Sequence, residues 1–395
     1  MEHTDGFLTL PYLRYCGIYR EMSKLKKLRT INCSAVLFVF MILQSIYVLQ
    51  NVEDFLSICD VIPTLVVGLV AICKLCIFVL KPAAIFSLID SFKMLQKHSN
   101  GEKQKLFQRS SRFHANLTKV YIMGALIVGW FYILSAVVAG VRQSIVEEKL
   151  RFFAPMAFPH NYQHPVVFVA TLLFNCDSIH MSIFINGSVD TCFSELATNV
   201  AIHFNIIQDR ARSIDFSKHT QNDLQDVIHY HMDLLSICSN VNSIFQHTVF
   251  YLLMLDSVLL CVIGYQFVLF MKTPRVVMLL SMAFVMLLQA VIYTYHGSKM
   301  HDESLRVADA FYQSNWYEGS LSMKRKLLFC MMRAQKPVVT KGGFIKATLP
   351  TLKKTLMLQQ NSSSTREFRL IDMIVVRLLK TILGNLNLQI RLGRI

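Results

Sequence analysis

Six apolar stretches, each long enough to cross a lipid bilayer, constrain the fold of this chain more than any other feature. A spanning helix needs about 20 predominantly apolar residues, because the hydrocarbon core is about 30 Å thick. The stretches that qualify cover residues 31–50, 61–80, 120–141, 166–188, 248–271 and 276–296. Of the 395 residues, 53% are hydrophobic and only 16% are charged. The sequence therefore predicts an all-α integral membrane protein, a multi-span helix bundle.

The distribution of Lys and Arg predicts how these spans are oriented, since short cytoplasmic loops carry an excess of basic residues. Basic residues gather at positions 14–29, before the first span, and at 81–119, between the second and third spans. They gather again after the sixth span, whereas loop 51–60 has none. The amino terminus is therefore expected in the cytoplasm, the reverse of a G-protein-coupled receptor. The formal net charge of +15 reflects these clusters and indicates no nucleic-acid partner.

Helical periodicity continues outside the spans. Within 189–247, apolar residues recur at steps of three and four on both sides of a polar break at 209–223. We expect the fourth and fifth spans to continue into the cytoplasm as a hairpin of long helices. A second helical pattern follows the sixth span and ends at Pro337, after which Gly342 and Gly343 offer a hinge. Together these segments predict a helix bundle under the membrane.

The sequence AFYQSNWY at 310–317, followed by KRKLL at 324–328 and MRAQKP at 332–337, resembles the late signature of insect odorant receptors. The resemblance extends over roughly 8–356. It implies seven spans and an odorant-gated cation channel subunit that forms a heterotetramer with the odorant receptor co-receptor. It also implies the plasma membrane of olfactory sensory neuron dendrites, no enzymatic activity and no cofactor. Late helices would join the subunits through anchor residues, namely Trp316, Tyr317, Arg333, Gln335 and Pro337, although plain helix packing also accounts for these side chains.

The resemblance further implies an apolar pocket for a small volatile organic ligand in the outer half of the span bundle. Such ligands offer few hydrogen bonds, so affinity comes from desolvation and shape. The predicted ligand-binding residues lie on the third, fourth and sixth spans: Phe131, Tyr132, Ser135, Phe168, Phe174, Met278 and Met282. For each of them, core packing or contact with lipid is the competing interpretation.

The carboxyl terminus departs from the family pattern. After Thr351 no stretch of about 18 apolar residues remains. Residues 366–383 instead predict a basic amphipathic helix suited to an anionic membrane surface. The chain thus divides into a cytoplasmic amino-terminal segment (1–30), spans one to four (31–188), a cytoplasmic hairpin (189–247), spans five and six (248–296), anchor helices (297–341) and an atypical tail (342–395).

Several alternatives stay open at this point. They are a gustatory receptor of the same superfamily, a G-protein-coupled receptor, and a non-conducting splice or degenerate form. A transporter is disfavoured, because few ionisable residues lie within the spans; Asp177, His180 and Asp256 are the main ones noted, expected to pair across the bundle or to line a wet cavity. No metal site is expected, and ten cysteines that lie mostly in apolar segments predict no disulfide framework.

Overall fold

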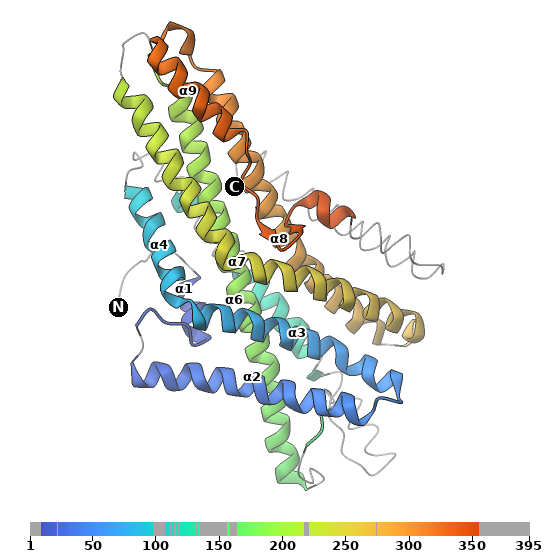
Figure 1. Ribbon diagram of the computed structural model, residues 1–395. Coiled ribbons are helices and arrows are strands. Elements are labelled where there is room, and N and C mark those ends of the chain that lie inside the picture. Colours follow the sequence, from blue (N-terminus) through green and yellow to red (C-terminus); the bar gives the residue numbers. More distant parts are fainter. Residues whose placement is uncertain are drawn as a thin grey trace.

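The computed structural model describes residues 9–354 except 22, 98–106, 111, 114–115, 117, 132, 135–155, 159–163, 217–220 and 274. Its elements are the helices α1 (Leu10–Tyr15), α2 (Lys24–Gln50), α3 (Phe55–Leu80), α4 (Pro82–Lys97), α6 (Pro165–Arg212), α7 (Gln221–Phe270), α8 (Arg275–Tyr312) and α9 (Leu321–Ala334), a 3-10 turn (Trp316–Glu318) and the short strands β1 (Lys341–Gly342) and β2 (Ile345–Lys346). Figure 1 shows a molecule built almost entirely of helices, as the composition predicts.

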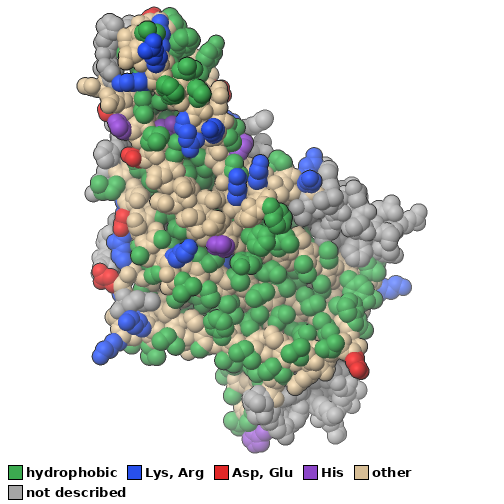
Figure 2. Space-filling model, viewed as in Figure 1, with side chains coloured by type: hydrophobic (Ala, Val, Ile, Leu, Met, Phe, Trp, Pro, Cys, Tyr) green, Lys and Arg blue, Asp and Glu red, His purple; other side chains and the backbone are tan. Residues whose placement is uncertain are grey.

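Within the described residues, five helices are long and apolar enough to cross a membrane, and they contain the first, second, fourth, fifth and sixth predicted spans. The third predicted span contributes a shorter apolar helix, Thr118–Phe131. The rest of that stretch and the atypical tail beyond 354 lie outside the described residues. Figure 2 shows apolar side chains gathered over the broad lower part of the molecule, where these spans lie, while many basic side chains lie above them.

The second predicted span begins earlier than its apolar pattern suggests. The carboxylate Oδ1 of Asp54 accepts hydrogen bonds from the backbone N–H groups of Leu56 (3.1 Å) and Ser57 (3.3 Å). These bonds satisfy donors that the first helical turn would otherwise leave unpaired. Cys59 is consequently a buried residue of α3 and a free thiol.

Three helices are much longer than a membrane crossing requires: α6 has 48 residues, α7 has 50 and α8 has 38. At 1.5 Å per residue, α7 alone extends for about 75 Å. Both α6 and α7 thus continue well past the fourth and fifth predicted spans. The helical pattern predicted after the sixth span is the continuation of α8 itself. In Figure 1 these extensions and α9 lie side by side; we call residues 189–247 and 297–334 the arm.

Aromatic side chains join the helices where the spans continue into the arm. Phe193 of α6 stacks on Tyr293 of α8, with ring centroids 4.6 Å apart, and lies 5.1 Å from the ring of Phe245 of α7. Phe78 of α3 meets Phe245 edge-on at 5.8 Å. All four rings are fully buried. Such pairs add about 0.5–1.5 kcal/mol each beyond the area they bury, so this layer fixes four helices relative to one another.

Two helices lie in segments that the charge pattern alone marks as basic loops. In α4 the apolar side chains of Ile85, Leu88, Ile89 and Phe92 recur at helical spacing and are buried. The amino-terminal α1 packs on α6, where Thr9 donates to Glu195 Oε2 from its backbone N–H (3.2 Å) and from its hydroxyl (2.8 Å). Basic residues mark the side of the membrane, but they do not exclude an amphipathic helix there.

Residues 338–352, which we call the strap, run back from α9 across the long helices. Their backbone N–H groups donate to side chains of the arm and its neighbouring turns: Val338 to Ser304 Oγ (3.0 Å), Lys341 to Asn242 Oδ1 (2.8 Å) and Leu349 to Ser298 Oγ (2.9 Å). Gly343 makes the turn between β1 and β2 with φ of +57°, a conformation that glycine adopts readily. The predicted hinge at Gly342 and Gly343 is therefore a fixed hairpin.

Candidate functional site

Two of the predicted ligand-binding residues lie where Ile133 meets one face of α6. Met278 and Met282 of α8 pack against Ile133 together with three residues of α6, Leu172, Cys176 and Ile179. The methionine thioethers and the Cys176 thiol are soft, polarisable groups that adapt to irregular apolar shapes. Two of the seven predicted residues thus come together with side chains from the other two helices.

The remaining predicted pocket residues are more scattered. Phe168 and Phe174 of α6 are half-buried, and Phe131 is 43% exposed. Tyr132 and Ser135 lie outside the described residues. Leu172, Cys176 and Ile179 are not among the predicted residues, although their spacing of four and three residues marks a single helical face. The predicted residue Phe174 lies on another face of the same helix.

A buried ion pair joins Lys74 of α3 to Asp190 of α6. Its Nζ and Oδ1 atoms are 2.5 Å apart, and the side chains are 1% and 0% exposed. Asp190 also accepts hydrogen bonds from the hydroxyls of Tyr121 (3.1 Å) and Tyr293 (2.8 Å) and from Gln289 Nε2 (2.7 Å). Four donors from α3, α8 and the helix 118–131 therefore converge on one carboxylate, which offsets its loss of water.

Lys74 lies within the second predicted span, and Asp190 lies in the segment predicted as a cytoplasmic hairpin. In the described part of the chain Asp177, His180 and Asp256 do not pair with one another, and the alternative expectation of a cavity applies to Asp256. Asp177 is exposed, and His180 packs its ring against Tyr15 and Phe184, with centroids 6.4 and 4.7 Å away. Asp256 is 5% exposed and lines a cavity between α7, α8 and the strap.

Two buried histidines in the arm stay neutral at physiological pH. Burial lowers the pKa of His203 to about 4; its ring lies between Phe92 and Phe107, and its Nδ1 is 2.5 Å from the Tyr230 hydroxyl. Burial, aided by Arg333, also lowers the pKa of His231 to about 4. His229, two positions away on α7, is exposed. No group of three potential metal ligands occurs in the part of the chain that the structure describes.

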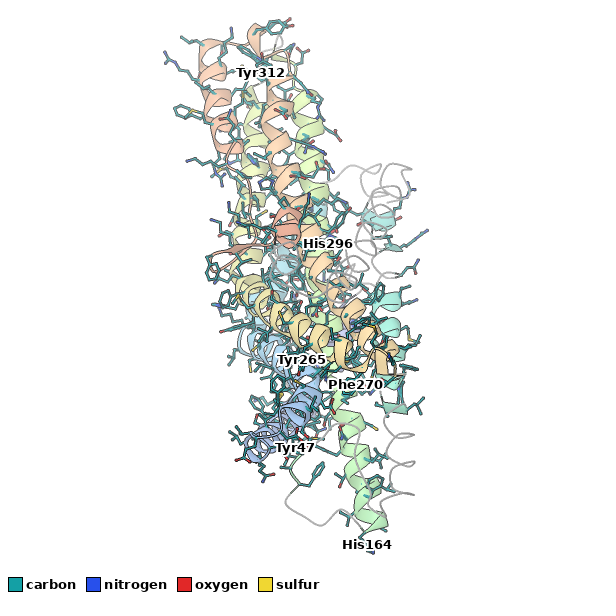
Figure 3. The ribbon with its side chains drawn as sticks, turned by 90° about the vertical axis from the view of Figure 1, so that its right-hand side faces the viewer. Tyr47, His164, Tyr265, Phe270, His296 and Tyr312 are labelled. Carbon is teal, nitrogen blue, oxygen red and sulfur yellow. The ribbon has the colours of Figure 1, made fainter. Side chains whose placement is uncertain are left out.

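The predicted anchor residues lie at the far end of the arm, near Tyr312, which Figure 3 shows at the opposite end of the molecule from His164. Trp316 packs against the main core, whereas Tyr317 is exposed. Arg333 donates to the carbonyl of Lys336 (3.2 Å), the backbone N–H of Gln335 donates to Met331 (2.9 Å), and Pro337 is half-buried after the end of α9.

The same end of the arm exposes a row of large apolar side chains that the sequence analysis identified only in part. We call this row the α9 face, and it consists of Tyr312, Tyr317, Leu321, Leu328, Phe329 and Met332. Phe329 is the most exposed of them, at 71%. Several exposed apolar side chains at one end of a helix bundle are typical of protein–protein contacts.

Comparisons with known proteins identify relatives of this chain. The model of the family described as 7tm odorant receptor matches residues 54–358. Odorant receptor 82a of Drosophila melanogaster is 24% identical over 317 residues, which cover 77% of this chain and 82% of that protein. Odorant receptor 47a of the same species is 24% identical over 347 residues, which cover 84% and 89% of the two chains.

Among solved structures, the insect olfactory receptor OR5 from Machilis hrabei in complex with eugenol is similar, with a TM-score of 0.76. The match covers 94% of this chain and 97% of the other at 14% identity, so it shows that the fold is shared. The resemblance predicted from residues 310–337 is confirmed by the family match. Because that match covers well over half of the sequence, this multi-pass membrane protein belongs to the insect odorant receptor family.

Proposed function

We propose that this chain is the odorant-binding subunit of an odorant-gated cation channel. In this proposal it works as a heterotetramer with the odorant receptor co-receptor in the plasma membrane of olfactory sensory neuron dendrites, with its amino terminus in the cytoplasm. The observation that carries the proposal is the apolar contact of Met278 and Met282 with Ile133 and one face of α6. Three helices meet there at side chains suited to a small volatile molecule.

The direct test is co-expression with the co-receptor, a calcium readout and a broad odorant panel. A response that requires both subunits is the expected result. Silence across the panel, with normal delivery to the cell surface, would contradict the channel function. An epitope tag at Met1 tests the orientation separately, because the tag should stain only after permeabilisation.

Replacing Met282 with alanine is expected to raise the odorant concentration for half-maximal response by about tenfold. The reason is that roughly 40–60 Å² of apolar contact, worth about 1–1.5 kcal/mol, is lost to the bound odorant. Dose–response curves with the best odorant of the panel measure the change. Met123→Ala is the matched control, since Met123 is 56% exposed. Equal shifts in the two variants would refute a pocket role for Met282.

The α9 face is proposed to join this chain to its neighbours in the channel. Phe329→Asp is expected to lower co-purification with the co-receptor by at least about tenfold, because a charge at a buried contact costs several kcal/mol. Met232→Asp is the matched control, since Met232 is an apolar residue of the arm that is 55% exposed on α7. Undiminished co-purification of the Phe329 variant would remove the α9 face from the interface.

One observation favours a second candidate, a subunit that binds odorant without completing the pore wall. The sequence after Thr351 contains no apolar stretch long enough for a seventh span. Such a form would bind odorant and assemble, yet give no current with the co-receptor. Odorant binding to purified protein, compared with current in the same cells, separates this candidate from the channel subunit.

A further inference from the structure

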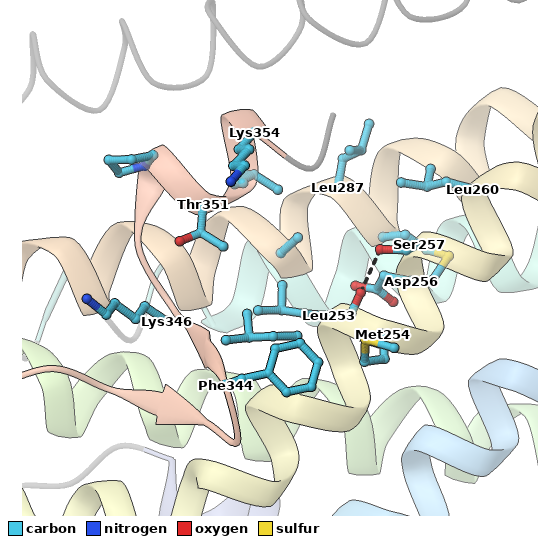
Figure 4. Close-up of a pocket in the computed structure, with 15 residues that line it drawn as sticks. Leu253, Met254, Asp256, Ser257, Leu260, Leu287, Phe344, Lys346, Thr351 and Lys354 are labelled. Atoms are coloured by element: carbon cyan, nitrogen blue, oxygen red, sulfur yellow. Dashed lines mark hydrogen bonds between the residues drawn. The ribbon is translucent and has the colours of Figure 1, made fainter. Parts of the chain in front are cut away.

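A cavity lies apart from the methionine contact described above. It is lined by α7, α8 and the strap, with a volume of about 540 Å³, within the range of about 300–1,000 Å³ typical of small-molecule sites. Figure 4 shows its walls, which are mostly apolar. Leu253 and Leu260 come from α7, Leu287 from α8, and Phe344 and Leu352 from the strap.

The carboxylate of Asp256 is the polar feature of this wall that most needs a partner. The side chain is 5% exposed, and its Oδ2 has no hydrogen-bond partner among the described residues. The neighbouring hydroxyl of Ser257 is already used, because it donates to the carbonyl of Leu253 (2.8 Å). A buried carboxylate oxygen that is left without a donor is costly, so this cavity favours a ligand that brings one.

Charge balance around Asp256 points to a ligand with a positive charge. Lys74 is close enough to interact electrostatically with Asp256, but its ammonium is bound to Asp190 at 2.5 Å. The carboxylates of Asp190 and Asp256 therefore share the ammonium of Lys74. These three side chains together lack one positive charge or one proton. A ligand ammonium against Asp256 would supply it and would add a charge-assisted hydrogen bond.

We propose that this cavity binds a small aliphatic amine, with its ammonium on Asp256 and its apolar body against Leu253, Leu260 and Leu287. Lys346 and Lys354 also line the cavity and are exposed, so they disfavour a ligand that arrives as a cation. An amine that crosses lipid as the neutral base avoids that repulsion. It then takes the proton from the neutral acid form of Asp256, so that the O–H bond breaks, an N–H bond forms and an ion pair results.

Other classes of ligand match the charged and hydrogen-bonding groups of the cavity less well. A lipid phosphate would pair with Lys346 and Lys354 but would leave the Asp256 oxygen without a donor. An anionic small molecule would meet the Asp256 carboxylate directly. A neutral alcohol would supply one hydrogen bond but no charge, and charge-assisted bonds are roughly twice as strong as neutral ones. Amine binding should therefore exceed binding of the alcohol of equal length.

The test uses the full chain in lipid nanodiscs and compares n-hexylamine with 1-hexanol. We expect hexylamine to raise the melting temperature and to bind at least about tenfold more tightly than hexanol, by the relation between affinity and free energy. Asp256→Asn should bring amine binding down to the level of the alcohol. Asp177→Asn is the matched control, since Asp177 is an exposed carboxylate of α6, and it should leave amine binding unchanged.

Leu260→Trp fills the cavity while it keeps the carboxylate, and it should also abolish amine binding. If Asp256→Asn fails to fold, the loss of amine binding in Leu260→Trp tests the proposal in its place. Equal binding of amine and alcohol, or amine binding that survives both substitutions, would overturn the proposal. The assay needs neither the co-receptor nor an odorant response, so a negative result leaves the proposed receptor function untouched.

Discussion

Gly342→Ala is expected to detach the strap from α7 and to lower the free energy of unfolding by about 3 kcal/mol, the upper part of the range for overpacking. A Cβ at this position would lie 2.5 Å from the backbone nitrogen of Phe250 and 2.8 Å from the carbonyl oxygen of Gln246. Both atoms belong to a helix backbone and cannot move aside as a side chain can. Thermal unfolding of the purified protein and surface abundance in cells measure the effect.

Gly297→Ala tests the other side of the same strap. The Cβ of the introduced alanine would overlap the carbonyl oxygen of Ala347. The strap can therefore lie close to both α7 and α8 because Gly342 and Gly297 have no side chain there. Gly124→Ala is the matched control, because a Cβ there meets nothing within 4 Å, and alanine raises helix propensity by about 1 kcal/mol. If the three variants melt at the same temperature, the strap does not depend on these close approaches.

The two glycines of the β1–β2 hairpin also show where sequence-based prediction fails. A pair of glycines after a helix is compatible with a hinge, with a turn and with a close approach of two backbones. The sequence pattern predicts a hinge at Gly342 and Gly343, whereas the structure has a hairpin there. The choice depends on the backbone of Phe250, which lies far away in the sequence and whose position no local pattern reveals.

Hydrophobic periodicity, by contrast, was sufficient for the long helices. It predicted that α6 and α7 continue past their spans, because a helix needs a continuous pattern of three- and four-residue steps and the chain provides one. The same pattern was present in α4 and in Leu172, Cys176 and Ile179, but charge and aromatic content received more weight there. The row of residues on α6 that meets Met278 and Met282 is therefore predictable in principle from spacing alone.

Buried charges are the hardest feature to predict. Lys74 and Asp190 are 116 positions apart, and each sits in a segment whose local pattern gives it another explanation. Only the packing of α3 on α6 brings them together. Charged residues buried in a membrane protein need partners, which means that the presence of Lys74 in a span was a signal that a carboxylate should be sought.

Lys74→Met is expected to lower the free energy of unfolding by about 3–5 kcal/mol, as for other buried pairs that lose one partner. The substitution leaves the carboxylate of Asp190, which is 0% exposed, with neutral donors alone. Asp190→Asn should have an effect of similar size, because it leaves a buried ammonium that is 1% exposed. Both variants should reach the cell surface poorly, and thermal unfolding in nanodiscs measures the loss directly.

The double variant Lys74→Met/Asp190→Asn distinguishes an unpaired charge from a general packing defect. It removes both charges while the side-chain carbonyl of the introduced asparagine still accepts from Tyr293 or Gln289, so it should be more stable than either single variant. Arg20→Met/Asp90→Asn is the matched control, since that ion pair is about half exposed, at 51% and 48%, and exposed pairs contribute about 0–1 kcal/mol. Destabilisation of the Lys74/Asp190 double variant equal to the sum of the single effects would mean that the two charges do not depend on each other.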